Sequence, residues 1–409
     1  MKIPITKPYF TEDELIEIKD TLESGWVVQG PKVRKFEEMF AEYVGVKYAV
    51  ATSSCTTALH LCLKAIGVSL GHDVLVPSFT FVATPNSVEY TGANVVFVDI
   101  DLDTYNMSVE DVEKIIDEKY EWDGEKLVNK ETGNILKALM PVHQFGLPAD
   151  IISLNKIARK YNLRIVEDGA CAVGARINGK HVGSFGNLCA FSFHPRKSIT
   201  TGEGGMIVTD NKEIAELVSI MRSHGGSVSD FQRHQSYGFL LPEYNILGYN
   251  YRMTDIQGAI GIHQMRKLEH ILNKKNEIVK IYRDELNNLE GIVLPYVPKG
   301  YTHGYQSFVC RIDNDILGLS VEEAHEIRYE LMKNLEEAGI STRQGTHASH
   351  MLGYYKRKYG YHAEDLKNSY KADRLSIALP LYYSMEEHEI SYVVEKFKFY
   401  WKEILERRG

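Results

Sequence analysis

The chain has 409 residues, which is enough for one large domain and one smaller one. Its apolar content of 44% and charged content of 25% are ordinary for a soluble globular protein, and the formal net charge of −8 offers no basic surface for nucleic acid. It contains no apolar run of about 18 residues, and the start MKIPITKPYF lacks the apolar core of a signal peptide. We therefore expect neither a nucleic-acid nor a membrane partner.

The cysteines favour a reducing compartment. There are five of them, an odd number without a close C-x-x-C pair: Cys55, Cys62, Cys171, Cys189 and Cys310. This pattern is typical of reduced thiols and not of a disulfide framework or a zinc site. We expect a cytoplasmic protein without a bound metal.

Short apolar runs alternate with helical patterns from about residue 45 to residue 210. Most of the runs are continuously apolar, as in strands buried on both faces. They predict seven strands, at 48–54, 73–79, 94–100, 138–143, 164–170, 188–194 and 205–210. Helices are predicted between them at 56–68, at 108–120 with Ser108 as N-cap, and at 149–162. This alternation predicts a mostly parallel sheet with helices on both sides.

The pattern changes beyond about residue 265. Residues 265–289 predict a long amphipathic helix, followed by a strand at 307–313 and a helix at 321–339. We therefore predict a large cofactor-binding domain over 1–265, and a linking helix with a small α+β domain over 266–409. A polar hairpin is also predicted at 120–138, with its turn at Asp123-Gly124.

Polar groups follow several of the predicted strands where the strands end. Asp168 ends one strand, Ser192 and Lys197 follow the next, and the stretch TSSCTT at 52–57 leads from a strand into a helix. Ligands of open parallel sheets bind beyond the carboxyl ends of the strands. A helix N-terminus rich in small hydroxyl residues suits a phosphate, because free N–H groups and the helix dipole both favour an anion.

Pyridoxal phosphate (PLP) requires such a set. A lysine bonds to its aldehyde, a carboxylate keeps its pyridine nitrogen protonated, and donors hold its phosphate. Each feature alone also has a structural explanation: Lys197 as a solvated loop residue, Asp168 as a turn former or cap, TSSCTT as a capping sequence and GEGG as a turn. Their joint placement predicts a PLP site.

The sequence resembles the sugar-nucleotide aminotransferases of the DegT/DnrJ/StrS type, which are PLP enzymes of fold type I. The motifs occur in the family's order over nearly the whole chain: SGWVVQGPKV, VPSFTFVATP, MPVHQFGLPAD, VEDGACAVGA, FSFHPRKSITTGEGG and LGYNYRMTDIQGAIG. The resemblance implies the aspartate-aminotransferase-like α/β fold. Its large domain has a mostly parallel seven-stranded sheet, and its small C-terminal domain is α+β.

The resemblance also implies roles for single residues. Lys197 matches the Schiff-base lysine, which also shuttles a proton, and Asp168 matches the partner of the pyridine nitrogen. Phe81 matches an aromatic residue that stacks on the cofactor ring. The phosphate contacts fall on Ser54, Cys55, Thr56, Ser192 and Asn250. In the family this asparagine reaches across to the other subunit, which implies a homodimer with shared active sites.

Some positions depart from the family pattern. Cys171 stands where glutamine, histidine or glutamate is usual, and a thiol is a weak hydrogen-bond partner. Gly169 stands where alanine is common. The hairpin near 120–136 and the segment 227–245 exceed the usual lengths, either to shape the substrate mouth or as neutral surface insertions. Three further candidates for substrate contacts are His143, Arg343 and His347.

The implied reaction moves an amino group from glutamate or glutamine to a nucleotide-linked ketosugar. A 4-keto-6-deoxysugar is the first choice and a 3-ketosugar the second, in amino-sugar, polysaccharide or lipopolysaccharide O-antigen biosynthesis. A cyclitol ketone is a further alternative acceptor. A PLP-dependent sugar dehydratase is another alternative, against which Lys197 argues because that branch carries histidine there. A non-catalytic PLP-binding regulator is the alternative from a different class.

Overall fold

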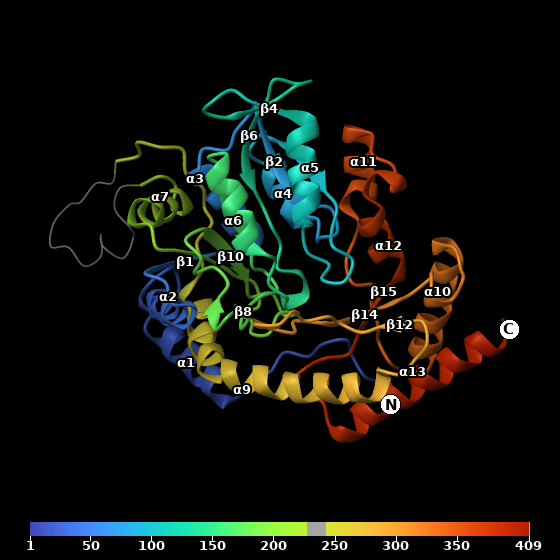
Figure 1. The fold of residues 1–409 in the computed structure, drawn as a ribbon. Coiled ribbons are helices and arrows are strands. Elements are labelled where there is room, and N and C mark those ends of the chain that lie inside the picture. Colours follow the sequence, from blue (N-terminus) through green and yellow to red (C-terminus); the bar gives the residue numbers. More distant parts are fainter. Residues whose placement is uncertain (227–242, 409) are drawn as a thin grey trace.

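The computed structural model describes residues 1–226 and 243–408 (Figure 1). Its central sheet contains nine strands, of which seven follow the order β1-β11-β10-β7-β6-β2-β3. These seven are β1 Tyr48–Thr52, β2 His72–Pro77, β3 Asn94–Val98, β6 Ile135–Leu139, β7 Arg164–Asp168, β10 Leu188–Ser192 and β11 Gly205–Thr209. The four pairs from β10 to β3 are parallel, and β11 is antiparallel to both of its neighbours. The predicted mostly parallel sheet is confirmed.

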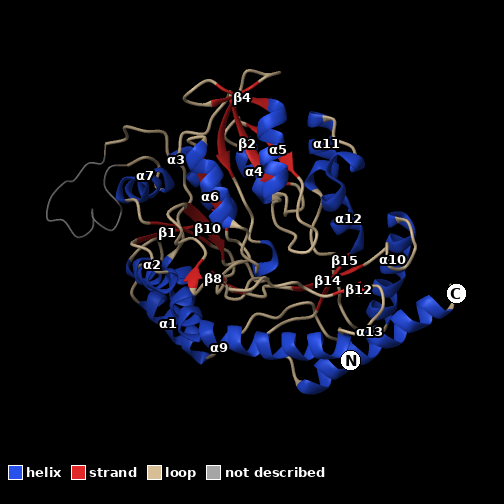
Figure 2. Cartoon of the chain, in the orientation of Figure 1, coloured by secondary structure: helices blue, strands red, loops and turns tan. Residues whose placement is uncertain are grey.

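Helices pack on both faces of this sheet (Figure 2), because successive strand residues point to opposite sides. In β2, Val74 and Val76 belong to one apolar core and Leu75 to another. The first core includes residues of α3 Cys55–Ala65, α4 Ala83–Glu89 and α7 Lys212–Arg222. On the other face lie α2 Pro31–Val44, α5 Val109–Lys119 and α6 Ile151–Lys160. Continuously apolar strands are thus buried on both sides, as predicted.

The predicted hairpin is present, with strands β4 Tyr120–Trp122 and β5 Leu127–Asn129. Its second strand pairs with Leu136 and Ile135, at the amino end of β6. The cofactor-binding edge of a parallel sheet is the carboxyl edge. The hairpin therefore lies at the opposite edge, which favours the reading of a surface insertion over a part of the substrate mouth.

The long helix α9, Asp255–Leu286, begins ten residues before its predicted start. Thr254 caps it, and Gln257 completes a capping box with this residue. The early turns contain the stretch GAIG, in which glycines weaken the helix prediction. Burial against α2 stabilises these turns, since Ile262 shares a core with Phe36. The predicted boundary at 265 thus lies inside a continuous helix.

The C-terminal part of the chain builds a second core around a three-stranded antiparallel sheet. The strands are β12 Ile292–Val293, β14 Phe308–Ile312 and β15 Ser376–Leu379, and the helices α10 Val321–Glu337 and α13 Glu387–Glu406 contribute to the same core. The predicted strand at 307–313 and helix at 321–339 are confirmed. Ile278 and Tyr282 of α9 belong to this core, as does Ile3 from the start of the chain.

The remaining elements are short or peripheral. They are α1 Glu12–Glu23, α11 Gly353–Tyr359, α12 Lys367–Leu375, β8 Arg176–Ile177, β9 Lys180–His181 and β13 Tyr301–Thr302. All five cysteines are free. Within the described ranges, no helix has the length and apolar character that crossing a membrane would need.

Candidate active site

The loops after β7 and β10 bring a carboxylate, a thiol and an amine together at the carboxyl edge of the sheet. These strands are parallel neighbours, and Asp168 at the end of β7 pairs with Ala190 of β10. Cys171 lies three residues beyond Asp168, and its Sγ accepts a hydrogen bond from Lys197 Nζ at 3.2 Å. Positions 26 residues apart in the sequence thus meet because adjacent parallel strands end side by side.

Asp168 is held in a fixed position inside the protein. Its side chain is 4% exposed, Oδ2 accepts a hydrogen bond from Thr84 Oγ1 at 2.7 Å, and Oδ1 accepts one from the Ala170 N–H at 3.0 Å. Burial raises the pKa of the carboxyl above its ordinary value, although both donors and the Lys197 charge oppose this. A buried carboxylate with satisfied oxygens suits a cationic partner such as a protonated pyridine nitrogen.

Thr84 was not predicted as a site residue. It is the second residue of α4, and its hydroxyl is 2.9 Å from that of Thr80. Two threonines one helical turn apart, just beyond the end of a buried strand, are the signal that could have identified the pair. Together they connect the loop after β2 to the carboxylate at the end of β7.

The surroundings of Lys197 shift the pKa of its amine in opposite directions. Burial is the largest and lowers the pKa of this group, but the Cys171 sulfur, Cys55 and Asp168 together outweigh it and raise the pKa above the ordinary lysine value. Without a cofactor the amine is therefore held as an ammonium by its polar neighbours. Its attack on an aldehyde requires loss of that proton.

The N-terminus of α3 has the arrangement of an anion-binding site, called the anion seat below. Ser54 is the N-cap, and its hydroxyl accepts the Thr57 N–H at 3.2 Å. The N–H groups of Cys55 and Thr56 have no acceptor among the described residues, which is the arrangement that binds phosphate at a helix start. Because its hydroxyl already serves as cap, Ser54 has less capacity for a phosphate than the two N–H groups.

Gly205 explains part of the glycine-rich stretch. It begins β11 opposite Ser192, and a Cβ at this position would lie 2.4 Å from the Ser54 carbonyl oxygen. Only glycine lets β11 approach the start of α3 so closely. This contact brings Ser192, which is 5% exposed, next to the anion seat.

Phe81 and Asn250 are both exposed. Phe81 is 65% exposed, whereas Phe79 on the same loop is buried, so an aromatic face is available beside Thr80 and Thr84. Asn250 forms an isolated bridge with Ser223, at the end of α7. Exposure leaves both residues free to contact a ligand or another subunit.

His143 is not placed for a substrate contact. Its side chain is fully buried, Nδ1 accepts the Ala149 N–H at 2.9 Å, and Nε2 lies 2.9 Å from Glu167 Oε2. Since Nδ1 is an acceptor, the neutral ring donates from Nε2 to this carboxylate. Both nitrogens are occupied, so neither remains for a sugar hydroxyl. The His143 backbone N–H instead donates to the Asp168 carbonyl at 3.0 Å.

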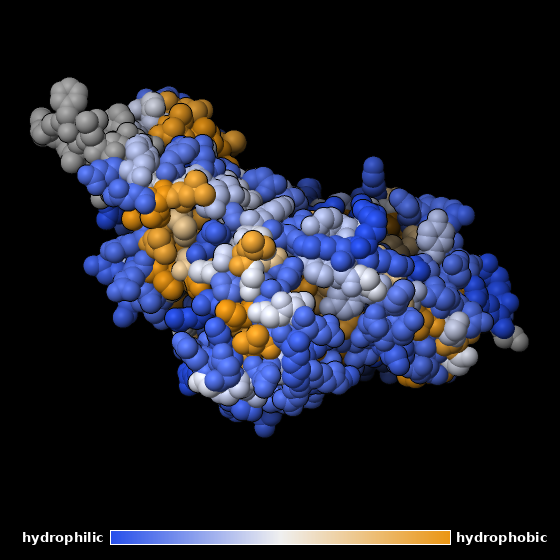
Figure 3. All heavy atoms as spheres, turned by 90° about the horizontal axis from the view of Figure 1, so that it is seen from above, coloured by the Kyte–Doolittle hydropathy of each residue, from blue (hydrophilic) through white to orange (hydrophobic). Residues whose placement is uncertain are grey.

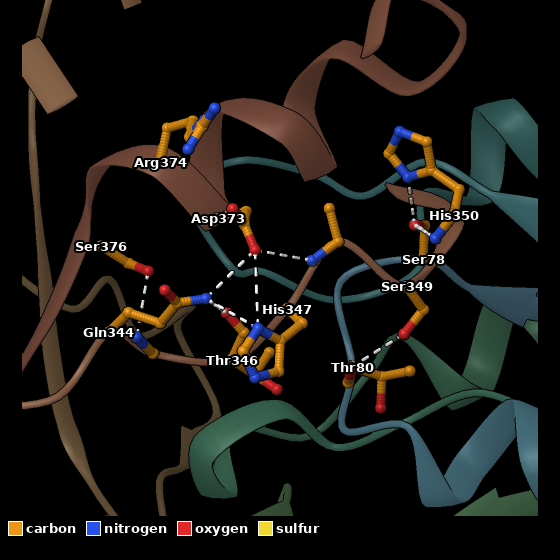
Figure 4. A network of polar contacts seen from close by, with 12 residues as sticks. Ser78, Thr80, Gln344, Thr346, His347, Ser349, His350, Asp373, Arg374 and Ser376 are labelled. Carbon is orange, nitrogen blue, oxygen red and sulfur yellow. Dashed lines mark hydrogen bonds and ion pairs between the residues drawn. The ribbon is translucent and has the colours of Figure 1, made fainter. Parts of the chain in front are cut away.

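A C-terminal segment, residues 343–350, docks onto the loop after β2 (Figure 4). The Thr80 N–H donates to the His347 carbonyl at 3.1 Å, and Ser349 Oγ donates to the Thr80 carbonyl at 3.1 Å. This docking places His347 against the loop that bears Phe81, whereas the Arg343 backbone pairs with Ala378 of β15. No local sequence pattern predicts this contact, because nearly 270 residues separate Thr80 from Ser349.

The two candidates on this segment differ in what they offer. Gln344 Nε2 donates to His347 Nδ1 at 2.9 Å, which leaves the exposed Nε2 of the neutral ring as a donor. Arg343 donates to the Thr342 carbonyl at 3.1 Å, and no carboxylate pairs with it among the described residues. The surface ion pair that would make Arg343 a purely structural residue is thus not formed there.

Two departures from the family pattern have different outcomes. A Cβ on Gly169 would lie 2.7 Å from Cys189 Sγ on β10. The Cys189 side chain fills the space that an alanine at position 169 would need. Cys171 contacts the amine of Lys197. Residues 227–242 of the long segment at 227–245 lie outside the described ranges.

The combined features fit PLP. A buried lysine amine, a buried carboxylate, a helix N-terminus with free N–H groups and an exposed aromatic ring lie towards one edge of the sheet, and these are the kinds of group that the cofactor requires.

Comparison with known proteins agrees with this chemistry. The sequence pattern of the DegT/DnrJ/EryC1/StrS aminotransferase family matches residues 8–398. The spore coat polysaccharide biosynthesis protein SpsC of Bacillus subtilis is 33% identical over 96% of this chain and 95% of its own length. The uncharacterised protein MJ1066 of Methanocaldococcus jannaschii is 38% identical, with 97% of each chain covered.

Solved structures extend the likeness to the fold. The putative sugar aminotransferase Spr1654 of Streptococcus pneumoniae, in its PMP form, superposes with a TM-score of 0.86 at 26% identity, with both chains fully covered. Its PLP form gives a TM-score of 0.85 over 99% of this chain and 100% of that one. The chain thus belongs to the DegT/DnrJ/EryC1/StrS aminotransferase family and is a PLP-dependent aminotransferase of the sugar-modifying type.

Proposed function

We propose that this enzyme transfers the amino group of glutamate or glutamine to a nucleotide-linked ketosugar, with a 4-keto-6-deoxysugar as the preferred acceptor. The observation that carries the proposal is the combination of Lys197, Asp168 and the α3 N-terminus at one edge of the sheet. Arg343 adds to it, because no carboxylate among the described residues pairs with this arginine. The relationship to SpsC, a spore coat polysaccharide protein, supports a role in polysaccharide biosynthesis. O-antigen synthesis is one such route.

In this proposal the residues of the site hold the cofactor. Lys197 would bond to its aldehyde, and Asp168 would pair with the ring nitrogen. The N–H groups of Cys55 and Thr56 bind its phosphate, together with Ser192. Phe81 covers the ring face, and Cys171 lies beside the lysine. When bound, PLP supplies an electron sink for the bond that breaks at the donor carbon.

The chain's own groups then move protons and position reactants. The Lys197 amine would serve as the base that takes a proton from the donor carbon and as the acid that gives it back. An ionised Asp168 carboxylate would favour a protonated ring nitrogen beside it. Thr84 and Ala170 keep that carboxylate in one orientation.

The ketosugar is proposed to bind at the 343–350 segment. Arg343 presents a planar fork of N–H groups, which suits a diphosphate better than a lysine would. His347 offers Nε2 to a sugar hydroxyl. With a net charge of −8, the whole protein does not attract an anion, so recognition has to be local.

A homodimer completes the proposed site, with Asn250 reaching the cofactor phosphate of the other subunit. Apolar side chains near it are exposed, with Leu247 at 81% and Ile246 at 39%. Figure 3 shows apolar side chains on the surface at the end of the molecule where α2 and α7 lie. Burial of such side chains between two copies would remove them from water. The free cysteines support a cytoplasmic location.

The test is product analysis with purified enzyme. Borohydride reduction and peptide mapping should place the cofactor label on Lys197. Repeated turnover with glutamate should convert a nucleotide 4-keto-6-deoxysugar into its amino sugar, identified by mass spectrometry, with 3-ketosugars and cyclitol ketones as parallel acceptors. Label on another lysine would refute the site. Cofactor binding without repeated turnover on any acceptor would favour a regulator, and loss of a hydroxyl without amination would indicate a dehydratase.

A further inference from the structure

A second buried lysine, Lys275 of α9, shares a cavity with Lys197. The cavity opens to solvent between the Lys197 loop, α9, residues 6–9 and residues 381–383. Lys275 is only 4% exposed. Nothing in the catalytic scheme above uses this residue.

The Lys275 amine has weak partners. Its Nζ donates to Ser198 Oγ at 3.3 Å and to the Gln306 carbonyl at 3.4 Å, both near the outer limit of a hydrogen bond. No carboxylate pairs with it among the described residues. Leaving a buried ammonium without a counter-ion is costly. Burial accordingly lowers the pKa of Lys275 to about 7, with Cys171 opposing the shift.

The cavity has the location for an anionic group of the amino donor. Ser198, which contacts Lys275, directly follows Lys197, and both lysines line the cavity. An amino donor has to bring its reacting nitrogen to the lysine that bonds to the cofactor, with its carboxylates a few bonds away.

We propose that Lys275 binds a carboxylate of the amino donor and so selects an amino dicarboxylate such as glutamate. This inference rests on the proposed function, since it assumes an amino-acid donor. Donor binding supplies the counter-ion that no described residue provides, and the ammonium form of Lys275 becomes the stable one. Tyr9 lines the same cavity, whereas the Gln264 amide there already donates to the Tyr9 carbonyl and to Glu14.

The test uses the holoenzyme and three variants. Lys275→Met removes the charge at similar length, Lys275→Arg retains it, and Lys280→Met removes an exposed lysine of the same helix as a matched control. Glutarate, a dicarboxylate without an amine, is the binding probe, and calorimetry measures its affinity. We expect Lys275→Met to weaken glutarate at least tenfold, and Lys275→Arg and Lys280→Met to change it less than threefold.

Half-reactions separate the donor from the acceptor. In Lys275→Met the glutamate concentration for half-maximal rate should rise at least tenfold in the first half-reaction, while the second half-reaction keeps its ketosugar affinity. If Lys275→Met lost only its affinity for the ketosugar, Lys275 would bind the diphosphate instead of the donor, and the proposal would be overturned. Equal loss in both halves, with glutarate binding retained, would also overturn it in favour of a structural role.

Two further measurements distinguish an unfolded variant, a wrong donor assignment and a wrong acceptor assignment from one another. Cofactor absorbance and thermal melting identify a variant that has not folded, in which case Lys275→Gln replaces Lys275→Met under the same expectations. If the unmodified enzyme aminates a ketosugar from alanine but ignores glutamate and glutarate, the donor assignment fails while the acceptor assignment stands. If it aminates no ketosugar yet Lys275 still controls glutarate binding, the acceptor assignment fails alone.

Discussion

Thr84 Oγ1 donates a 2.7 Å hydrogen bond to Asp168 Oδ2, and this bond joins the loop after β2 to the carboxylate at the end of β7. In the same loop, the Thr80 N–H donates to the His347 carbonyl of the C-terminal segment, and the Thr80 carbonyl accepts a hydrogen bond from Ser349 Oγ. A contact network therefore runs from the proposed sugar-binding segment, through Thr80 and Thr84, to the carboxylate that is proposed to control the cofactor ring.

The first prediction concerns this bond. Thr84→Val keeps the shape of the side chain and removes the donor, so the ionised form of Asp168 loses a charge-assisted hydrogen bond worth about 1.5–3 kcal/mol. We expect the first half-reaction with glutamate to slow about tenfold or more. Stopped-flow absorbance of the cofactor measures the rate.

The control for Thr84 is Thr80→Val. Its hydroxyl contacts Thr84 Oγ1 at 2.9 Å but makes no contact with the carboxylate. We expect a smaller change, below about threefold. Equal losses in the two variants would show that the loop as a whole, and not the bond to Asp168, sets the rate.

The second prediction concerns Cys171. This sulfur raises the pKa of the Lys197 amine, against burial, which lowers it. Cys171→Ala should therefore lower that pKa and increase the fraction of neutral amine at pH 7. We expect apoenzyme of this variant to bond PLP faster at pH 7, with its rate–pH profile displaced to lower pH. Cys310→Ala, in the C-terminal core, should leave the profile unchanged.

The third prediction concerns the proposed dimer. Asn250→Ala should weaken cofactor retention, because a phosphate contact is lost. Mixing Asn250→Ala and Lys197→Ala chains should restore activity in a fraction of the dimers, in which one site carries both lesions and the other carries neither. Activity assays and cofactor content after mixing provide the measurement. No recovery, or a fully loaded monomer in sedimentation, would contradict sharing across the interface.

The fourth prediction separates the substrates. Arg343→Ala should raise the ketosugar concentration for half-maximal rate at least tenfold in the second half-reaction, because a desolvated arginine–phosphate contact is worth about 1.5–3 kcal/mol. The glutamate half-reaction should change less than about twofold. The exposed Arg357 of α11 provides a matched control, Arg357→Ala. Comparable losses in both halves would assign Arg343 a structural role.

The fifth prediction concerns stability. Burial alone would raise the pKa of the Glu14 carboxyl, but hydrogen bonds from Lys267, Thr11 and Gln264 hold it at about 2. Because the folded pKa lies below the unfolded one, this contribution is complete above about pH 4.5 and disappears as the pH falls towards 2. Glu14→Gln should lower the free energy of unfolding by about 2–3 kcal/mol at pH 7 and much less near pH 2.

Urea unfolding at several pH values measures this difference. Glu12→Gln, an exposed neighbour in the same helix turn, should change stability by less than about 0.5 kcal/mol. A constant deficit for Glu14→Gln across the pH range would attribute the loss to packing instead of ionisation.

The sequence alone determined the sheet, because its strands are continuously apolar and this pattern arises from burial on both faces. It also located Asp168, Lys197 and the TSSCTT seat at strand ends, since residues at the carboxyl ends of parallel strands necessarily share one edge. The family motifs then supplied the role of each residue. Local pattern and motif order were sufficient for these features.

Tertiary structure alone decided which polar groups became satisfied. His143 resembled a site residue in the sequence, yet packing occupied both of its nitrogens with Ala149 and Glu167. Thr84 and Lys275 resembled ordinary helix residues, yet the fold directs Thr84 at Asp168 and buries Lys275 where no described carboxylate pairs with it. A hydrogen-bond partner distant in the chain leaves no periodic signal, so only the folded arrangement identifies it.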